Sequence, residues 1–155
     1  MPLEAPEEYI EPYKGGDKKR AIYSGMVAVM DEAIGNITNH LKERNLWDNS
    51  LIVFTTDNGG QAYAGGSNLP FRGNKGSYWE GGIKGVGFIT GGAAKDLVPF
   101  GGEYNHLFHI SDWMPTLLDA VGCSKGPRDL DGLRNRSFII ESCFLSEFVL
   151  SLRIF

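Results

Sequence analysis

Two adjacent oxygen-bearing side chains, Asp57 and Asn58, come directly after a short apolar run and before two glycines. One carboxylate beside one amide carbonyl supplies hard oxygen ligands, which suit Ca²⁺ or Mg²⁺ rather than zinc. Gly59 and Gly60 would let the backbone turn away without placing a Cβ against a bound ion. The Asp-Asn-Gly sequence also favours an ordinary turn, so the tetrapeptide alone leaves both interpretations open.

A second candidate for chemistry, Lys75, lies in the segment from Arg72 to Gly76, and Tyr78 and Trp79 follow it closely. A lysine ammonium is a compact point charge that can approach an anion such as sulfate or phosphate. A solvated basic loop is the alternative, and this segment alone does not exclude it.

A count of ligands limits what Asp57 and Asn58 can do by themselves. Calcium takes about six to eight oxygen ligands, of which this pair supplies a minority. No second acidic pair follows another apolar run in the sequence. If the pair binds a metal ion, we therefore expect the other ligands to come from polypeptide outside this chain.

The remaining polar and thiol candidates favour structural roles. His106 and His109 are three residues apart, but the sequence places no third metal ligand near them. Asp112 is explained by the dipole of the helix that it begins. Cys123 and Cys143 form no CxxC motif, and two ordinary apolar residues are favoured over a disulfide bridge.

The elements that must position these residues begin with an extended loop over residues 1–20. Apolar residues at spacings of three and four predict a helix over 21–44. The almost continuous apolar and β-branched run over 50–56 predicts a strand buried on both faces of a parallel sheet. A long glycine-rich loop follows and extends to about residue 82.

The second half of the chain again shows strand, loop and helix patterns in succession. Residues 85–90 predict another strand, and residues 91–105 another loop. A helix is predicted over 112–121, with Ser111 as its N-cap and Gly122 as its C-terminal stop. This order of elements is an α/β pattern.

Composition excludes several classes of protein. The chain has 155 residues, a hydrophobic share of 42% and a net charge of −4, which exclude a disordered chain and a nucleic-acid-binding protein. The first residues show no signal peptide, and the apolar stretch from residue 133 to 155 is too often interrupted by charges to be a membrane span. Most of the 21 glycines lie between Gly59 and Gly102, which indicates unusual backbone geometry in the middle of the chain.

A longer segment, FTTDNGGQAYAGGSNLPFRGNKGSYWEGGIKGVGFI (Phe54–Ile89), closely resembles the second half of the catalytic domain of sulfatases, in particular the arylsulfatase B (N-acetylgalactosamine 4-sulfatase) branch. Tyr23–Ile37, His109–Gly122 and Leu130–Leu133 are similar to neighbouring family segments. We therefore expect a partial sulfatase catalytic domain over residues 1–132, and a divergent tail over residues 133–155.

The resemblance implies an alkaline-phosphatase-like α/β fold, incomplete here, with a partial mixed sheet flanked by helices. It implies a hydrolase of sulfate esters that binds one Ca²⁺, with Asp57 and Asn58 among the metal ligands. Lys75 matches the family lysine that contacts the substrate sulfate. The expected substrates of the complete protein are sulfated carbohydrates, such as glycosaminoglycans, or aryl sulfate esters.

The sequence also departs from the family pattern. The family nucleophile is a formylglycine made from a cysteine within C-x-P-S-R, and neither Cys123 nor Cys143 lies in such a motif. The paired aspartates that complete the family's calcium shell are absent too, and we expect them upstream of residue 1. The chain alone is therefore expected to be inactive. A non-catalytic truncated isoform that binds ions or a partner is the alternative, and a two-zinc phosphatase or phosphodiesterase is disfavoured.

Asn36 and Asn135 lie in glycosylation sequons, of which Asn36 is the better candidate because Asn135 lies in the divergent tail. The resembling family passes through the secretory route. The complete protein is therefore expected to be lysosomal or secreted, with its targeting signal outside this chain.

Overall fold

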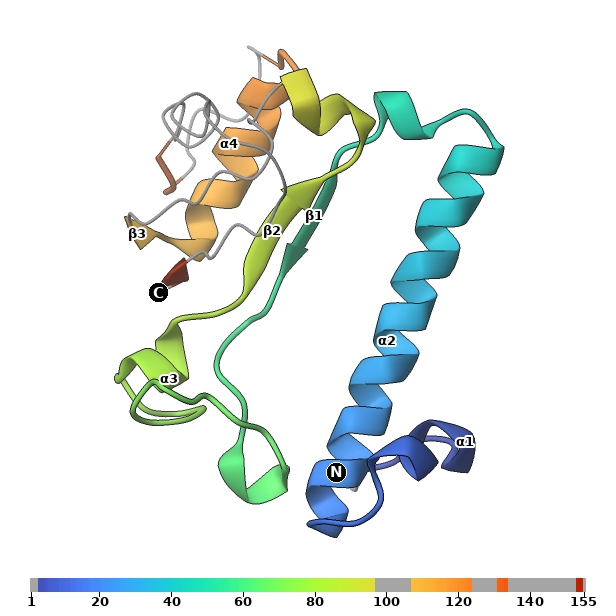
Figure 1. Cartoon of the computed structure of the whole chain (residues 1–155). Helices are drawn as coiled ribbons and strands as arrows, with labels where there is room; N and C mark the ends of the chain where they lie inside the picture. The colour runs from blue at the N-terminus through green and yellow to red at the C-terminus, as the bar shows by residue number, and fades with distance from the viewer. Residues whose placement is uncertain (1–2, 97–106, 124–130, 134–152, 155) are drawn as a thin grey trace. The chain divides into compact units, whose positions relative to one another are not determined.

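The computed structural model describes residues 3–96, 107–123, 131–133 and 153–154. The chain forms two compact units, shown in Figure 1. The first unit comprises Met1–Leu46 and Gly59–Gly82, and the second comprises Trp47–Asn58 and Ile83–Phe155. The chain therefore passes from one unit to the other directly after Asn58.

The first unit begins with helical turns rather than with the extended loop predicted for residues 1–20. Helix α1 spans Glu7–Ile10, and a 3-10 turn, η1, spans Glu11–Tyr13. Pro6 precedes α1 with φ −58° and ψ 144°, and two acidic side chains occupy its first turn. Acidic residues in the first turn of a helix complement its dipole and favour helix initiation, so the prediction gave too little weight to this local signal.

The long helix α2 spans Lys18–Glu43 and confirms the helix predicted over 21–44. It begins three residues earlier than predicted because the carboxylate of Asp17 accepts a hydrogen bond from the backbone N–H of Arg20, at 2.8 Å. Such an N-cap satisfies one of the backbone donors that a helix leaves open at its start.

Helix α1 packs against the first half of α2 (Figure 1). Gly25 allows the approach, since a Cβ at this position would lie 3.1 Å from the carbonyl oxygen of Tyr9. The hydroxyl of Tyr9 donates a hydrogen bond to Oε2 of Glu32, at 2.6 Å. This hydrogen bond is the main reason that the pKa of Tyr9 is raised above its ordinary value.

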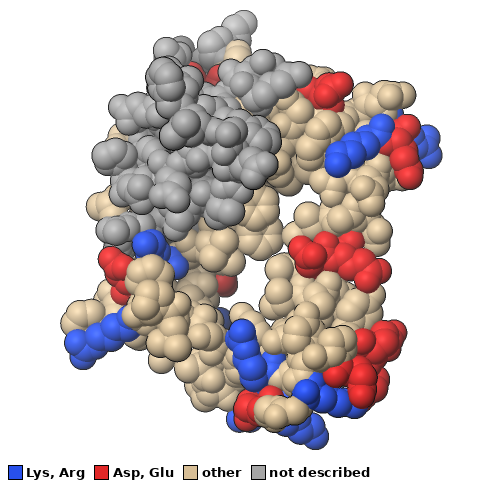
Figure 2. Space-filling view, in the orientation of Figure 1, with Lys and Arg blue, Asp and Glu red and all other residues tan. Residues whose placement is uncertain are grey.

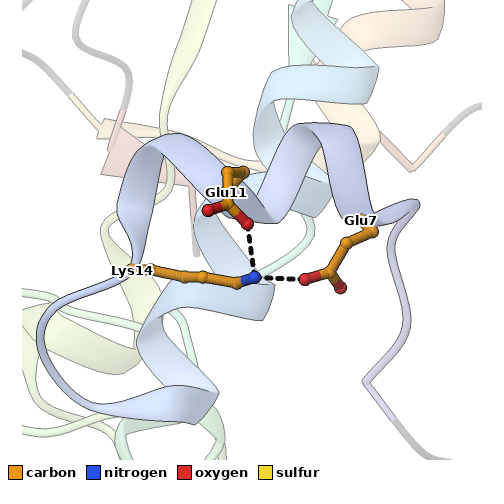
Figure 3. Close-up of polar contacts among 3 residues, drawn as sticks. All are labelled: Glu7, Glu11 and Lys14. Atoms are coloured by element: carbon orange, nitrogen blue, oxygen red, sulfur yellow. Dashed lines mark hydrogen bonds and ion pairs between the residues drawn. The ribbon is translucent and has the colours of Figure 1, made fainter.

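The ammonium group of Lys14 bridges two carboxylates of the N-terminal turns, as Figure 3 shows. Its partners are Glu11 and Glu7, and all three side chains are exposed. The hydrogen bond to Glu11, followed by that to Glu7, raises the pKa of Lys14 to about 12. These contacts connect Lys14, which follows η1, to Glu7 of α1 and Glu11 of η1.

The second unit is built on two antiparallel strands, β1 (Ile52–Thr55) and β2 (Gly87–Thr90). Their register pairs Phe54 with Phe88. These two rings stack with their centroids 5.0 Å apart and their planes 13° from parallel. The strands lie side by side in Figure 1 although the glycine-rich loop separates them in sequence.

Both predicted strands are present, but each is shorter than the range predicted from sequence. The predicted parallel pairing of the first strand is wrong, because its partner β2 runs antiparallel. The predicted full burial is also wrong, since three residues of β1 are half-buried and Thr55 is exposed. An apolar run gives the residues that favour a strand but not the direction of its partner.

The core of the second unit forms around β2. Among the described residues of this unit, the buried apolar side chains are Ile89, Ala94, Phe108 and Trp113. The shorter elements of this unit are η2 (Trp47–Asn49), η4 (Gly92–Asp96), β3 (Leu107–Phe108) and β4 (Arg153–Ile154). Strands β3 and β4 pair in parallel.

The last described helix, α4, spans Trp113–Ala120 and confirms the helix predicted over 112–121. The predicted Ser111 cap is wrong, because a 3-10 turn, η5 (Ile110–Asp112), precedes α4 and His109 caps that turn. Gly122 ends the helix as predicted, with φ +71° and its N–H donating to the carbonyl of Asp119, at 3.0 Å.

The predicted glycine-rich loop joins β1 to β2 and contains two short helical elements, η3 (Ala62–Ala64) and α3 (Glu80–Ile83).

On the face drawn in Figure 2, acidic and basic side chains of the described residues lie intermixed. Within the described part of the chain, no helix combines the length and the hydropathy needed to cross a membrane.

Candidate functional site

Asp57 and Asn58 follow the end of β1, where the sequence predicted them. The Asp57 carboxylate is exposed and Asn58 is half-buried. Among the described residues, the Asp57 side chain takes part in no hydrogen bond or ion pair. Its oxygens are therefore available to a cation.

The strand pairing holds the backbone up to the residue before Asp57. The N–H of Thr56 donates to the carbonyl of Val86, at 2.9 Å. The hydroxyl of Thr56 accepts from the N–H of Val86, at 2.8 Å, and lies 3.3 Å from the carbonyl oxygen of the same residue. These contacts hold Thr56, the residue directly before Asp57, in place beside Val86, the residue directly before β2.

Lys75 lies in the glycine-rich loop of the first unit, and its side chain is exposed. Its backbone N–H donates to the carbonyl of Gly60, at 3.3 Å. The turn around it is closed by Ser77, whose N–H and hydroxyl donate to the carbonyl of Asn74 at 2.9 and 2.8 Å. In the described ranges, no carboxylate forms an ion pair with the Lys75 ammonium. The ammonium is therefore available to an external anion.

One residue that the sequence analysis missed, Asn68, holds this loop together. Its Oδ1 accepts from the N–H of Gly60, at 2.8 Å, and its Nδ2 donates to the carbonyl of Gly60, at 2.8 Å. The same Nδ2 lies 3.3 Å from the carbonyl oxygen of Gly73. The only sequence signal was an amide side chain within a run of glycines, which by itself also suits a solvent-exposed turn.

The glycines of the loop allow backbone segments to pack against one another. A Cβ on Gly59 would lie 1.8 Å from the carbonyl oxygen of Gly81. A Cβ on Gly82 would lie 2.2 Å from the carbonyl oxygen of Ser77. The sequence analysis assigned Gly59 to close approach by an ion, whereas the structure gives a contact within the chain as the physical reason.

Arg72 and Trp79 add a side-chain contact to the same loop. The guanidinium carbon of Arg72 lies 3.8 Å from the centroid of the Trp79 ring, which is cation–π geometry. The neighbouring Tyr78 is 96% exposed. Arg72 is thus held by an aromatic ring, whereas the Lys75 side chain makes no such contact with the residues that the structure describes.

The donors present fit part of a calcium shell. Asp57 and Asn58 offer a carboxylate and an amide, which are hard oxygen ligands, and both belong to the second unit. Lys75 belongs to the first unit. Across the described ranges, no three His, Cys, Asp or Glu side chains are grouped so as to hold a metal ion.

His109 and Asp112 form a cap within the second unit. Nδ1 of His109 lies 2.7 Å from the Ser111 hydroxyl, while Oδ2 of Asp112 accepts from the N–H of His109, at 3.0 Å. Oδ1 of Asp112 accepts from the N–H of Leu133, at 2.8 Å. The expected structural role of His109 is confirmed, but Asp112 is buried and does more than complement a helix dipole. His106 lies outside the described residues.

Cys123 does not fit the apolar, buried role expected from its residue type. It is exposed and has a free thiol. Its N–H donates to the carbonyl of Leu118, at 2.8 Å, which places it just beyond the Gly122 turn that ends α4. Cys143 lies outside the described residues.

Asn36 is exposed on α2. Thr38 of its sequon donates through its hydroxyl to the carbonyls of Ile34 and Gly35, at 2.5 and 3.0 Å. The sequon is therefore helical in the folded chain. Asn135 lies outside the described residues.

Comparison with known proteins decides the family. The family profile described as Sulfatase matches residues 1–123. The chain belongs to the sulfatase family. Arylsulfatase J of Mus musculus is 47% identical over 133 residues, which are 84% of this chain and 22% of that protein. Arylsulfatase H of Canis lupus familiaris is 32% identical over 136 residues, which are 81% of this chain and 23% of that protein.

A solved structure, that of Ps i-CgsB in complex with k-i-k-neocarrahexaose, superposes on this sulfatase chain with a TM-score of 0.82 at 32% identity. The match covers 92% of this chain and 32% of that one. The predicted alkaline-phosphatase-like sulfatase fold is confirmed, in the form of a partial α/β structure. The chain spans about a fifth of the length of the curated relatives quoted, at 22% and 23%.

Proposed function

We propose that this sulfatase chain carries part of the active site of an arylsulfatase B-like hydrolase of sulfate esters. In this proposal Asp57 and Asn58 are ligands of one Ca²⁺, and Lys75 contacts the ester sulfate. The substrate of the complete protein would be a sulfated carbohydrate, such as a glycosaminoglycan, or an aryl sulfate. Membership of the family supports the reaction class, and the resemblance of Phe54–Ile89 to the arylsulfatase B branch supports the finer assignment.

The observation that carries the proposal is the exposed carboxylate of Asp57, which lies at the end of an anchored strand and has no partner among the described residues. A carboxylate in that position can bind a hard cation without first breaking an ion pair. When bound, Ca²⁺ would supply positive charge for the oxygens of the sulfate group. The role of this chain is to hold two of the ligands and to present the Lys75 ammonium.

Isothermal titration calorimetry of the purified 155-residue chain with Ca²⁺ tests the metal assignment. Because Asp57 and Asn58 provide a minority of a calcium shell, we expect weak binding, with a Kd of about 10⁻⁴ to 10⁻³ M or weaker. Asp57→Asn should abolish the calorimetric signal, because it removes the negative charge of the pair. Asp31→Asn is the matched control, since Asp31 is an exposed carboxylate on α2. Equal binding by the wild type and Asp57→Asn would contradict the assignment.

The sulfate assignment of Lys75 is tested separately with inorganic sulfate. We expect the Cε resonance of Lys75 to shift on titration, and the response to vanish in Lys75→Met. Lys84→Met is a comparison variant, because Lys84 is a lysine of the second unit. An unchanged Lys75 resonance at high sulfate concentration would contradict a sulfate contact within this chain.

We further propose that the chain alone does not hydrolyse sulfate esters, because it contains no C-x-P-S-R motif. In this proposal the nucleophile and the remaining calcium ligands belong to polypeptide outside this chain. Release of the phenol from an aryl sulfate by the purified, sequence-verified chain would refute it.

The remaining assignments stay predictions. They are the lysosomal or secreted location of the complete protein, the glycosylation of Asn36, and the domain boundary between residues 132 and 133. Expression through the secretory route followed by glycosidase digestion would reveal a glycan on Asn36 as a loss of mass, which Asn36→Gln should prevent.

A further inference from the structure

We propose that Asn68 is a positioning residue for Lys75. This inference rests on the proposed contact between Lys75 and sulfate, and it adds the group that fixes the lysine in place. Asn68, Gly60, Gly73 and Lys75 all lie in the first unit, so the argument depends only on contacts within that unit.

The Asn68 amide acts as a clamp between two stretches of backbone. It accepts from the N–H of Gly60 and donates to the carbonyl of the same residue, both at 2.8 Å. Its third contact, at 3.3 Å, is with the carbonyl of Gly73. An asparagine amide offers one acceptor and two donor hydrogens, so this geometry uses both of its functions.

The two clamped residues are those that set the position of Lys75. The carbonyl of Gly60, which Asn68 holds, also accepts the backbone N–H of Lys75, at 3.3 Å. Gly73 lies two residues before Lys75 in the sequence. Asn68 therefore fixes both the acceptor of the lysine amide and the backbone that leads into the lysine.

The glycines make such a clamp necessary. Glycine loses more conformational freedom on folding than any other residue, so a loop rich in glycine spreads over many conformations unless contacts restrict it. Gly73 has φ +92°, a conformation that the clamp holds in place. Holding the lysine backbone in one position reduces the ordering that an anion must impose when it binds.

Amide hydrogen exchange of the 155-residue chain tests the clamp directly. Asn68→Asp keeps the acceptor and the shape of the side chain but removes the donor, while Asn68→Ala removes both. We expect the Lys75 amide to exchange about tenfold faster in either variant, as the loss of one or two hydrogen bonds predicts. The matched control is Asn74→Asp, because Asn74 is an exposed asparagine of the same loop.

The amide of Gly25, a buried position inside α2, reports whether the first unit stays folded in each variant, because α2 and Asn68 lie in the same unit. Its exchange should stay unchanged while that of Lys75 accelerates. If Asn68→Ala accelerates both amides, the isosteric Asn68→Asp decides the question. Unchanged exchange of Lys75 in Asn68→Asp would overturn the proposal.

Titration with inorganic sulfate separates positioning from general stability. We expect Asn68→Ala and Asn68→Asp to raise the Kd for sulfate, measured from the Lys75 Cε resonance, by about threefold to tenfold. Asn74→Asp adds the same charge next to Lys75, and it therefore measures the contribution of repulsion. Wild-type affinity in Asn68→Ala would overturn the positioning role. If the wild-type chain gives no sulfate response, the proposed sulfate contact fails, and the exchange experiment still decides whether Asn68 orders Lys75.

Discussion

The backbone N–H of Gly59 donates to the carbonyl of Gly82, 2.9 Å away, and closes the loop that carries Lys75. The two residues are far apart in sequence but adjacent in space, and each lacks a Cβ where the backbone of another segment passes. The loop is therefore held by hydrogen bonds between main-chain groups, with the Asn68 amide between them.

Gly59→Ala should open this loop. The new Cβ would lie 1.8 Å from the carbonyl oxygen of Gly81, which is a backbone atom and cannot simply rotate away. We expect the free energy of unfolding to fall by about 1–3 kcal/mol, as for overpacked sites. Urea denaturation followed by circular dichroism measures the change.

Gly16→Ala is the control for Gly59→Ala, because a Cβ at Gly16 meets no heavy atom within 4 Å. We expect this control to shift the urea midpoint very little. Equal midpoints for the two variants would show that the tight packing at Gly59 is unimportant.

Gly35→Ala should stabilise the chain. Gly35 lies inside α2, and a Cβ there meets no heavy atom outside the helix within 4 Å. Replacing glycine by alanine in a helix interior is worth about 0.5–1 kcal/mol, because the unfolded chain loses conformational freedom. A higher thermal midpoint would show this effect.

Gly25→Ala provides the contrast within the same helix. Its Cβ would lie 3.1 Å from the carbonyl oxygen of Tyr9 on α1. The helix-propensity gain should therefore be cancelled or reversed. An equal gain at Gly25 and Gly35 would count against close packing of α1 on α2.

Asp112→Ala should destabilise the second unit. Asp112 is 7% exposed, and its carboxylate accepts hydrogen bonds from the backbone N–H groups of His109 and Leu133. Leaving such donors without their partner costs about 1–3 kcal/mol. Asp31→Ala, an exposed position on α2, should cost much less in the same urea titration. Similar losses for the two variants would argue against a structural role for Asp112.

Lys14 should titrate with a pKa near 12, because Glu11 and Glu7 stabilise its charged form. Since the folded-state pKa lies above the ordinary value of 10.5, the stabilisation is fully present below about pH 10.5 and is lost as the pH rises through 12. Glu11→Gln should lower the Lys14 pKa more than Glu7→Gln does, as followed by the Lys14 Cε resonance. A larger effect of Glu7→Gln would reverse the assigned order of the two partners.

The sequence by itself determined the local features of this protein. The apolar stripe predicted α2, the β-branched run predicted β1, and Gly122 ended α4 as expected. The position of Asp57 and Asn58 just beyond β1, after Thr56, was also predicted, because strand and turn preferences depend on neighbouring residues. The oxygen chemistry of that pair follows from residue type alone.

Only the tertiary structure decided which distant segments meet. The antiparallel pairing of β1 with β2 and the contact of the buried Asp112 with Leu133 join residues far apart in the sequence. The clamp formed by Asn68 spans only eight residues to Gly60, but it depends on how the loop folds back on itself. Gly59 shows the difference, because the carbonyl oxygen of Gly81, which is distant in the sequence, leaves no room for a Cβ at position 59. Composition predicted unusual backbone geometry in this region, and the packing of backbone against backbone gives its physical cause.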